Sequence, residues 1–220
     1  MNAHSDKATF EIPYGSIERP TTRNTPAEQA QFEVPALQWA DLSDAKHGLS
    51  LLNDCKYGYD AKGNVLRLSL LRSPEWPDPH ADEGQHEFTY AIYPHEGSWR
   101  DAQTVRRGYE LNYPLLSLQT EKHQGQLKDE FSFFGVGADN VVITAVKKAE
   151  DDGALIIRFY EWAGKAGDVQ VRLPPGAESA AETDLMERAT GNLPLPSGNI
   201  AVPTKPYEIK TVRVQFTAPR

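Results

Sequence analysis

The stretch SPEWPDPHADEGQH, residues 73–86, gathers side chains that could bind a metal ion or move protons, namely Asp78, His80, Asp82, Glu83 and His86. Zinc needs ligands that converge in a tetrahedron, and this spacing offers neither paired His residues on a helix face nor Cys partners. Calcium needs a regular run of oxygen ligands with a Gly near its middle, which the prolines of this stretch do not supply. We therefore expect a solvated loop and no metal site in this chain.

Covalent and acid–base catalysis find little support in the rest of the sequence. No Gly-x-Ser-x-Gly string, Gly-rich phosphate loop or dinucleotide fingerprint occurs. The pairs Asp54 and Asp60, or Asp78 and Asp82, are catalytic candidates by residue type alone. Because loop Asp residues mostly cap turns, we expect no catalytic pair here.

Strand-like runs must position these loops, and we place them at residues 49–52, 65–71 and 87–93. In the second run Leu66, Leu68 and Leu70 alternate with polar residues, and in the third Phe88, Tyr90 and Ile92 occupy alternate positions. A period of two is typical of half-buried antiparallel strands. Residues 60–64, DAKGN, read as a hairpin turn, because Gly and Asn tolerate positive φ. The three runs together predict a β meander.

The same residues carry a resemblance to a known family. The strings LLNDCKYGYD, GNVLRLSLLRSP and DEGQHEFTYAIYPH, followed by ITAVKKAEDD, LIIRFYEWAG and YEIKTVRVQF, stand in this order along the chain. They resemble the carboxy-terminal β-domain of glycoside hydrolase family 38, the retaining α-mannosidases. The resemblance covers nearly the whole chain.

This resemblance implies that the chain is non-catalytic. In the family an amino-terminal α/β barrel carries the nucleophilic Asp and the zinc, and β-sandwich domains follow it. A retaining glycosidase needs two carboxyl groups about 5 Å apart, and the resemblance places them in the barrel. It implies a chain without a cofactor of its own, whose partners are the barrel and, through the parent enzyme, a mannosyl glycan.

The family's sandwich also contributes residues to the rim of the barrel's active site. Sugars are bound by planar hydrogen-bonding groups and by aromatic faces. By that criterion the rim candidates are Arg72 first, and then Asp54, Tyr57 and His86. For each, a purely structural role as a buried or turn-satisfying polar group is the alternative.

The expected fold is mainly β, an antiparallel β-sandwich in two parts. A charged stretch at residues 119–130 suggests a boundary, with a portion of a β-super-sandwich at 1–125 and a small terminal β-sandwich at 126–220. In the second part we expect strands at 131–134, 141–147, 155–162, 169–173 and 207–216. A change of apolar phase in the last strand predicts a bulge or a bend near Lys210 or Thr211.

Three further segments carry a local prediction. Residues 98–112 should form a short helix, with Ser98 as its cap and Asp101 in its first turn. Residues 178–190 could be a short helix, whereas the resemblance implies an extended segment at DLMER, residues 184–188. Residues 21–36 are expected to form a surface loop. Trp39 is expected to be buried.

Composition narrows the class of partner. The 220 residues include 23 Lys and Arg against 31 Asp and Glu, and the net charge of −8 argues against nucleic acid or an anionic membrane. No segment has the apolar length of a membrane span. The single cysteine, Cys55, excludes an internal disulfide and points to a reducing compartment, the cytoplasm.

Two other functions fit the sequence besides that of an accessory domain. A stand-alone carbohydrate-binding module would present clustered, exposed aromatic side chains, for instance Trp76, Trp99 and Trp162. A purely structural domain, which supports the barrel or a homo-oligomer, would instead expose a large apolar face.

Overall fold

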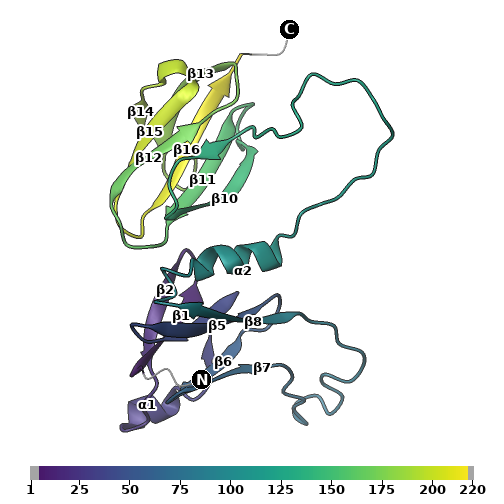
Figure 1. The fold of residues 1–220 in the computed structure, drawn as a ribbon, viewed down its shortest axis with the longest axis vertical. Helices are drawn as coiled ribbons and strands as arrows, with labels where there is room; N and C mark the ends of the chain where they lie inside the picture. The colour runs from purple at the N-terminus through teal and green to yellow at the C-terminus, as the bar shows by residue number, and fades with distance from the viewer. Residues whose placement is uncertain (1–4, 218–220) are drawn as a thin grey trace. The chain divides into compact units, whose positions relative to one another are not determined.

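The computed structural model describes residues 5–217 of the chain, which forms two compact units. Unit 1 comprises Met1–Ser117 and unit 2 comprises Leu118–Arg220. Both units are built of antiparallel sheets. The described residues also form two short α-helices, both in unit 1, and one 3-10 turn in unit 2, so the predicted mainly β fold is confirmed (Figure 1). No described helix has the length and apolar character needed to cross a membrane.

Unit 1 contains two sheets. The five-stranded sheet has the order β2-β1-β4-β5-β8, with β1 at Lys7–Ile12, β2 at Gly15–Pro20, β4 at Trp39–Ser43, β5 at His47–Asn53 and β8 at Tyr90–Glu96. The three-stranded sheet has the order β3-β6-β7, with β3 at Val34–Pro35, β6 at Gly58–Lys62 and β7 at Val65–Ser69. A five-residue helix, α1 at Pro26–Ala30, lies in the segment for which only a loop was expected.

The core of unit 1 lies between these two sheets. One face of β1 and β4 buries Phe10 and Leu42, and the facing side of β6 buries Tyr59 and Ala61. The rings of Phe10 and Tyr59 meet edge to face with their centroids 6.3 Å apart. This alternation of buried positions is what a two-layer antiparallel sandwich requires.

The helix α2, at Thr104–Asn112, lies on the other side of the five-stranded sheet (Figure 1). Trp39 of β4 is fully buried there, as predicted, with its ring centroid 5.1 Å from that of Trp99. A Cβ atom on Gly108 would lie 3.1 Å from Cδ1 of Trp39, so a side chain at this position would crowd the indole. Gly108, which weakens an isolated helix, here lets α2 approach the sheet.

The predicted helix therefore exists, but it is shorter than residues 98–112. Ser98 and Asp101 do bond to each other, since Asp101 Oδ2 accepts from the backbone N–H of Ser98 at 2.9 Å and from its hydroxyl at 2.7 Å. These bonds close a separate turn that precedes the helix. Gln103 follows with a left-handed φ of 54°, and the helix begins only after it, at Thr104.

The predicted meander is wrong, although the predicted hairpin is confirmed. β6 and β7 pair around Gly63, whose φ is 56°. β5, however, pairs with β4 and β8 in the other sheet. The third run begins at Tyr90 rather than at residue 87, and its apolar side chains are not buried, since Tyr90 and Ile92 are 51% and 63% exposed.

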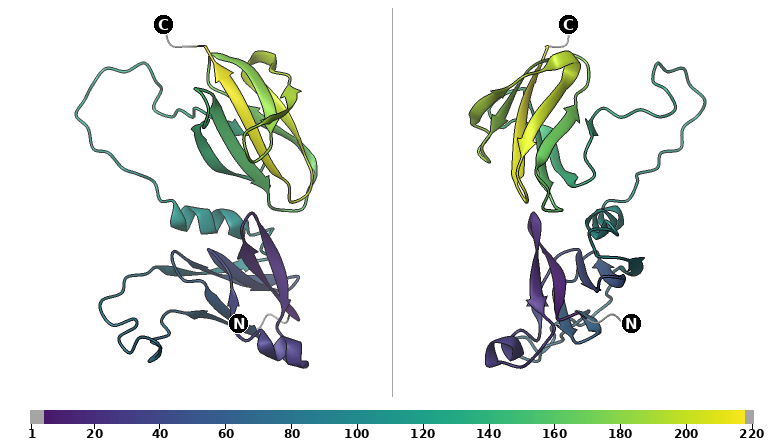
Figure 2. Two further views of the ribbon diagram at one scale, coloured as in Figure 1. Left: turned by 180° about the vertical axis from the view of Figure 1, so that it is seen from behind. Right: turned by 60° about the vertical axis from the view of Figure 1, so that its left-hand side comes forward.

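Unit 2 is a two-sheet sandwich (Figure 2). Its larger sheet has the order β10-β11-β16-β13-β14, with β10 at Val141–Lys148, β11 at Leu155–Glu161, β13 at Ala177–Thr183, β14 at Ala189–Leu193 and β16 at Ile209–Phe216. Its smaller sheet has the order β15-β12-β9, with β9 at Gly135–Val136, β12 at Gly167–Arg172 and β15 at Asn199–Thr204. A single 3-10 turn, η1 at Pro196–Gly198, precedes β15. Val171, Ile200 and Val212 are among the side chains buried between the sheets.

Three predictions for unit 2 need correction. Residues 131–134 form no strand, and the strand in this region is β9. The segment 178–190 contains no helix, since β13 runs to Thr183 and β14 starts at Ala189, and residues 184–188, expected to be extended, form the turn between these two strands. β16 pairs with β11 in unbroken register from Ile209 to Val214, so no bulge occurs at Lys210 or Thr211. Lys210 instead lies on the same side as Val212, at the strand's end, and its Nζ pairs with Glu182 Oε1 at 2.7 Å.

Candidate functional site

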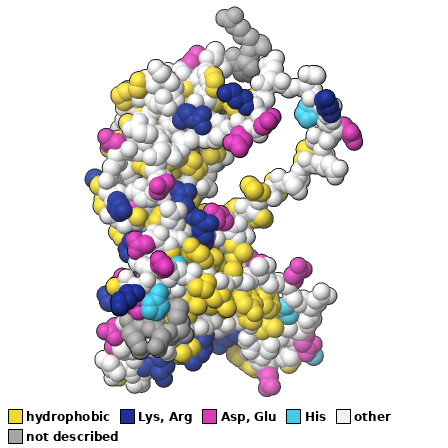
Figure 3. Space-filling model, viewed as in Figure 1, with side chains coloured by type: hydrophobic (Ala, Val, Ile, Leu, Met, Phe, Trp, Pro, Cys, Tyr) yellow, Lys and Arg dark blue, Asp and Glu magenta, His cyan; other side chains and the backbone are white. Residues whose placement is uncertain are grey.

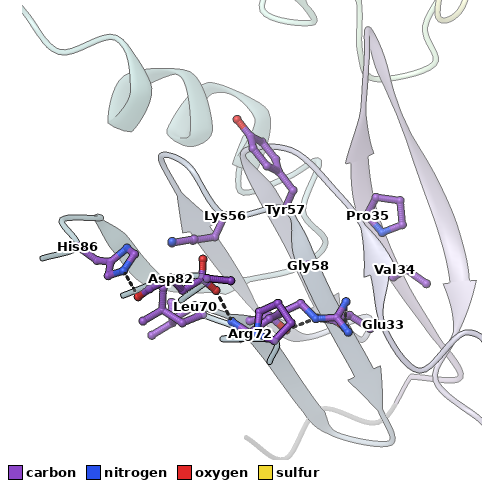
Figure 4. Close-up of a pocket in the computed structure, with 14 residues that line it drawn as sticks. Glu33, Val34, Pro35, Lys56, Tyr57, Gly58, Leu70, Arg72, Asp82 and His86 are labelled. Carbon is purple, nitrogen blue, oxygen red and sulfur yellow. Dashed lines mark hydrogen bonds and ion pairs between the residues drawn. The ribbon is translucent and has the colours of Figure 1, made fainter. Parts of the chain in front are cut away.

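A groove of about 590 Å³ opens on unit 1 where β3, β6 and β7 meet the segment that follows β7 (Figure 4). Its polar lining includes Glu33, Lys56, Arg72, Asp82 and His86. The groove therefore brings together the segment that leads into β3, the segment that leads into β6, and the loop after β7 that was first considered for metal binding.

Asp82 fixes the backbone at the end of β7. Its Oδ2 atom accepts from the backbone N–H of Ser73 at 2.8 Å and from that of Arg72 at 3.3 Å. These two bonds lower the pKa of the Asp82 carboxyl, so it stays ionised. Asp82 is thus a structural anchor, and it holds the backbone that carries the Arg72 side chain.

The Arg72 side chain itself is largely free to meet a ligand. It is 78% exposed, and its Nη1 atom lies 3.8 Å from Glu33 Oε2. Glu33 is in turn held by a hydrogen bond from the hydroxyl of Ser69. A Cβ on Gly58 would lie 2.8 Å from Glu33 Oε1, so a larger residue at position 58 would displace the Glu33 carboxylate.

Two further cationic or ionisable groups border the groove. The Nζ atom of Lys56 lies 4.8 Å from the ring centroid of Phe88, a cation–π contact. Nε2 of His86 lies 2.8 Å from the backbone oxygen of Asp82. Guanidinium, ammonium and carboxylate groups at one groove can exchange hydrogen bonds with a polyhydroxylated ligand.

The structure brings three of the four predicted rim residues together. Tyr57, Arg72 and His86 all line the groove, although Figure 4 shows the Tyr57 ring directed away from Asp82 and Arg72. Asp54 lines a separate hollow of about 340 Å³, which it shares with Tyr57.

Asp54 serves the turn that leads into β8. Its Oδ1 atom accepts from the backbone N–H of Thr89 at 2.9 Å, and this bond lowers the pKa of the carboxyl. The turn-satisfying alternative therefore describes Asp54, and the groove is built without it. Glu33 and Lys56 border the groove but were not among the candidates. Lys56 directly precedes the candidate Tyr57 in sequence, and this neighbourhood is the one feature from which Lys56 could have been predicted as a groove residue.

The loop residues do not offer a metal site. Among residues 5–217, no three His, Cys, Asp or Glu side chains are grouped so that they could hold a metal ion. Instead they bond within the loop, where His80 Nδ1 lies 3.1 Å from Glu83 Oε1. The zinc implied by the resemblance does not fit the described part of this chain.

Two family descriptions match the sequence. Residues 1–80 match the glycosyl hydrolases family 38 C-terminal domain, and residues 140–212 match the glycosyl hydrolases family 38 C-terminal beta sandwich domain. The chain belongs to the carboxy-terminal region of glycosyl hydrolase family 38. The strings quoted for the resemblance fall largely in these two stretches, so the resemblance is confirmed.

Curated relatives of this family 38 region extend the match to nearly the whole chain. Alpha-mannosidase 2C1 of Homo sapiens is 40% identical over 220 residues, which cover 98% of this chain and 21% of the relative. Alpha-mannosidase G of Dictyostelium discoideum is 39% identical over 210 residues, which cover 94% of this chain and 19% of the relative. The chain thus spans about a fifth of the length of these relatives.

A solved structure shares the fold. An alpha-mannosidase from Enterococcus faecalis V583 superimposes with a TM-score of 0.79 at 19% identity, over 96% of this chain and 24% of that one. The arrangement of sheets described above is therefore that of a segment of this larger structure.

Proposed function

We propose that this family 38 region is the non-catalytic carboxy-terminal β-domain of a retaining, zinc-dependent α-mannosidase that hydrolyses terminal α-mannosyl residues of glycans. The observation that carries the proposal is the match to relatives named alpha-mannosidases over 98% of the chain but only 21% of their length. Catalytic groups and zinc are then assigned to other parts of the longer polypeptide. The single Cys55 supports a cytoplasmic enzyme.

Within that enzyme we assign this groove of unit 1 to the rim of the substrate site. Arg72 is the leading residue, because its side chain is exposed while its backbone is fixed by Asp82. His86 and Lys56 supply further donors beside it. The partners proposed are the catalytic barrel of the same polypeptide and, through it, a mannosyl glycan.

The alternative of a stand-alone carbohydrate-binding module loses its main support. Its three expected aromatic contacts are not on one surface, since Trp99 and Trp162 are only 3% and 4% exposed. Trp76 is 85% exposed. A structural role, which supports the barrel or a homo-oligomer, overlaps with the proposal and agrees with the exposed apolar side chains of β8.

The proposal is tested by hydrolysis of an aryl α-mannoside. The 220-residue chain should show no turnover with or without added zinc, whereas the longer polypeptide that contains it should show zinc-dependent turnover. In the longer polypeptide, Arg72→Ala should lower kcat/KM by roughly 10-fold or more, the loss expected for one charged hydrogen-bonding group.

Arg67→Ala is the matched control. Arg67 lies on β7, upstream of Arg72, but its Nη1 atom pairs with Asp60 Oδ2 at 2.5 Å and it does not line the groove. Its removal should leave kcat/KM within about twofold, because exposed ion pairs contribute little. Zinc-dependent turnover by the isolated chain would overturn the proposal. Equal effects of Arg72→Ala and Arg67→Ala on kcat/KM would show that Arg72 does not contact the substrate.

A further inference from the structure

The carboxylate of Glu33 crosses the central strand of the smaller sheet of unit 1. Glu33 directly precedes β3. In β6, Gly58 pairs with Pro35 of β3 on one side and with Ser69 of β7 on the other. Oε1 of Glu33 nevertheless accepts a hydrogen bond from the hydroxyl of Ser69. The Glu33 side chain can reach β7 over Gly58, because this position has no side chain in its way.

The second oxygen of this carboxylate faces Arg72 of the groove. Oε2 of Glu33 lies 3.8 Å from Nη1 of Arg72, and Figure 4 shows the guanidinium directed toward Glu33. The backbone of Arg72 is held separately, since its N–H donates to Oδ2 of Asp82 at 3.3 Å. Arg72 is therefore held at both ends, its backbone by the loop after β7 and its guanidinium by the residue that precedes β3.

Glu33 differs from the carboxylate of an ordinary surface ion pair. Two mobile side chains lose conformational entropy when they pair at a surface, and this loss cancels most of their attraction. The Glu33 side chain is only 25% exposed and is already fixed by Ser69, so the entropic cost of pairing falls on Arg72 alone. A separation of 3.8 Å is also longer than a hydrogen bond, so the guanidinium N–H groups stay available to a ligand.

Glu33 is the partner of Arg72 although other carboxylates are nearer in sequence. The loop after β7 contains Glu75, Asp78 and Glu83, and Figure 3 shows acidic and His side chains on unit 1 in the region of this loop. The Arg72 guanidinium nevertheless pairs with Glu33. The pair therefore turns the guanidinium away from its own loop and toward β3.

We propose that Glu33 is a positioning residue, which holds the Arg72 guanidinium in the orientation in which it contacts the substrate. The inference rests on the proposed function, in which Arg72 lies on the rim of the mannoside site. Glu33 acts through Arg72 and does not itself contact the substrate. A guanidinium that is held in place before the substrate arrives loses less conformational freedom on binding, so Glu33 strengthens binding.

Glu33→Gln isolates the charge of this residue. The amide keeps the shape of the side chain and an acceptor for the Ser69 hydroxyl, so the urea midpoint of unit 1 should not change. In the 220-residue chain, NMR relaxation should show that the order parameter of the Arg72 Nε–H bond falls by roughly a third, because the guanidinium loses its partner. The same bond of Arg67, which pairs with Asp60, should keep its value and is the internal reference.

The effect on binding is measured on the longer polypeptide with an aryl α-mannoside. Glu33→Gln should lower kcat/KM by about threefold, the size expected of one partly exposed ion pair. The loss should lie in KM, because a rim residue binds the substrate away from the cleaved bond. In an Arg72→Ala background the same substitution should cause no further loss. Glu18→Gln is the matched control, since Glu18 pairs with Lys7 outside the groove and its substitution should leave kcat/KM unchanged.

Two outcomes would overturn the inference alone. An unchanged order parameter in Glu33→Gln would show that Arg72 is held without Glu33. An equal loss of kcat/KM in the presence and absence of the Arg72 side chain would show that Glu33 acts on the substrate or on the fold directly. The Arg72→Ala variant separates these results from the proposed function. Unchanged kcat/KM in that variant would refute the rim and this inference with it, whereas a loss there without any effect of Glu33→Gln would refute only the role of Glu33.

Discussion

Nε2 of His95 lies 2.8 Å from Oδ2 of Asp41, and the two side chains are 3% and 1% exposed. The same Asp41 atom accepts from the hydroxyl of Ser50 at 2.8 Å, and Oδ1 accepts from that of Ser43 at 2.6 Å. Ser50 also contacts the hydroxyl of Thr104 at 2.7 Å. This buried network joins β4, β5, β8 and the first residue of α2. It therefore fixes the helix on the sheet through polar contacts.

Asp41→Ala should lower the free energy of unfolding of unit 1 by about 3 kcal/mol, because it leaves three buried donors without their acceptor. Amide hydrogen exchange of β4 and β5 measures this loss locally. Glu18→Ala is the control, since Glu18 is 52% exposed and pairs with the exposed Lys7, and its effect should stay below about 1 kcal/mol. Equal effects of the two substitutions would contradict the structural role of Asp41.

Gly48 makes room for the His95 ring. A Cβ at this position would meet Nε2 of His95 at 2.9 Å and come closer still to Cε1 of His95 and to Cβ of Ser43. Gly48→Ala should therefore destabilise unit 1 by about 1–3 kcal/mol through overpacking, which urea unfolding would measure.

Gly167→Ala provides the matched control for Gly48. Gly167 also lies on a strand, at the start of β12, but no atom lies within 4 Å of its Cβ position. Its substitution should change stability by no more than about 0.5 kcal/mol. A tolerated Gly48→Ala would mean that His95 can move without loss, and that the network is looser than its distances indicate.

The strands that follow a regular apolar alternation were predictable from sequence. β7 and β11 appear within a few residues of their expected bounds, because their Leu, Ile and Val residues face a core. The sequence of β13, AESAAET, is rich in Ala and Glu, which favour helices, so its local pattern does not indicate a strand. Its pairing with β16 decides the matter, and such long-range pairing is not written in local sequence.

The groove was predictable only in part, for the same reason. Arg72 and His86 lie within the strings that carry the resemblance, so sequence could indicate them. Glu33 reaches the groove because β3 packs beside β6, at residues far apart along the chain. The Asp41–His95 pair joins residues 54 positions apart, and no local pattern connects them.

Glu161 should be a main stabilising residue of unit 2. Its carboxylate is fully buried and accepts from the backbone N–H groups of Ala163, Gly164 and Tyr207 at 2.7, 2.8 and 2.9 Å. Oε1 also accepts from Nδ2 of Asn140 at 2.9 Å. Glu161→Ala leaves these donors unsatisfied and should cost about 3 kcal/mol or more, measured by hydrogen exchange of β11 and β16.

Glu161→Gln tests whether the charge or only the acceptor atoms matter. It keeps one carbonyl acceptor and the side-chain shape, so it should cost roughly half as much as Glu161→Ala. Glu178→Ala, at an exposed position of β13, should cost no more than about 0.5 kcal/mol. If Glu178→Ala lowered the free energy of unfolding as much as Glu161→Ala, the buried Glu161 carboxylate would not be a main stabilising group of unit 2.

Glu11 should make the stability of unit 1 depend on pH. The residue is 4% exposed, and burial raises the pKa of its carboxyl from 4.5 to about 7, although Oε2 accepts from the backbone N–H of Gln38 at 2.6 Å. The folded state therefore holds a proton that the unfolded state releases above pH 4.5. Its contribution to stability is complete below about pH 4.5 and is lost as the pH rises to 7, a change of roughly 3 kcal/mol.

Glu11→Gln should remove this dependence, because a neutral amide keeps an acceptor for Gln38 without the ionisation. Urea unfolding of both proteins between pH 4.5 and 8 gives the difference in unfolding free energy, which should shift steadily in favour of Glu11→Gln as the pH rises and level off above about 7. Glu18→Gln, on the exposed face of β2, should follow the wild type across the whole range. A constant difference between wild type and Glu11→Gln would show that Glu11 is already ionised in the folded protein at pH 4.5 and that its burial has no linkage to protons.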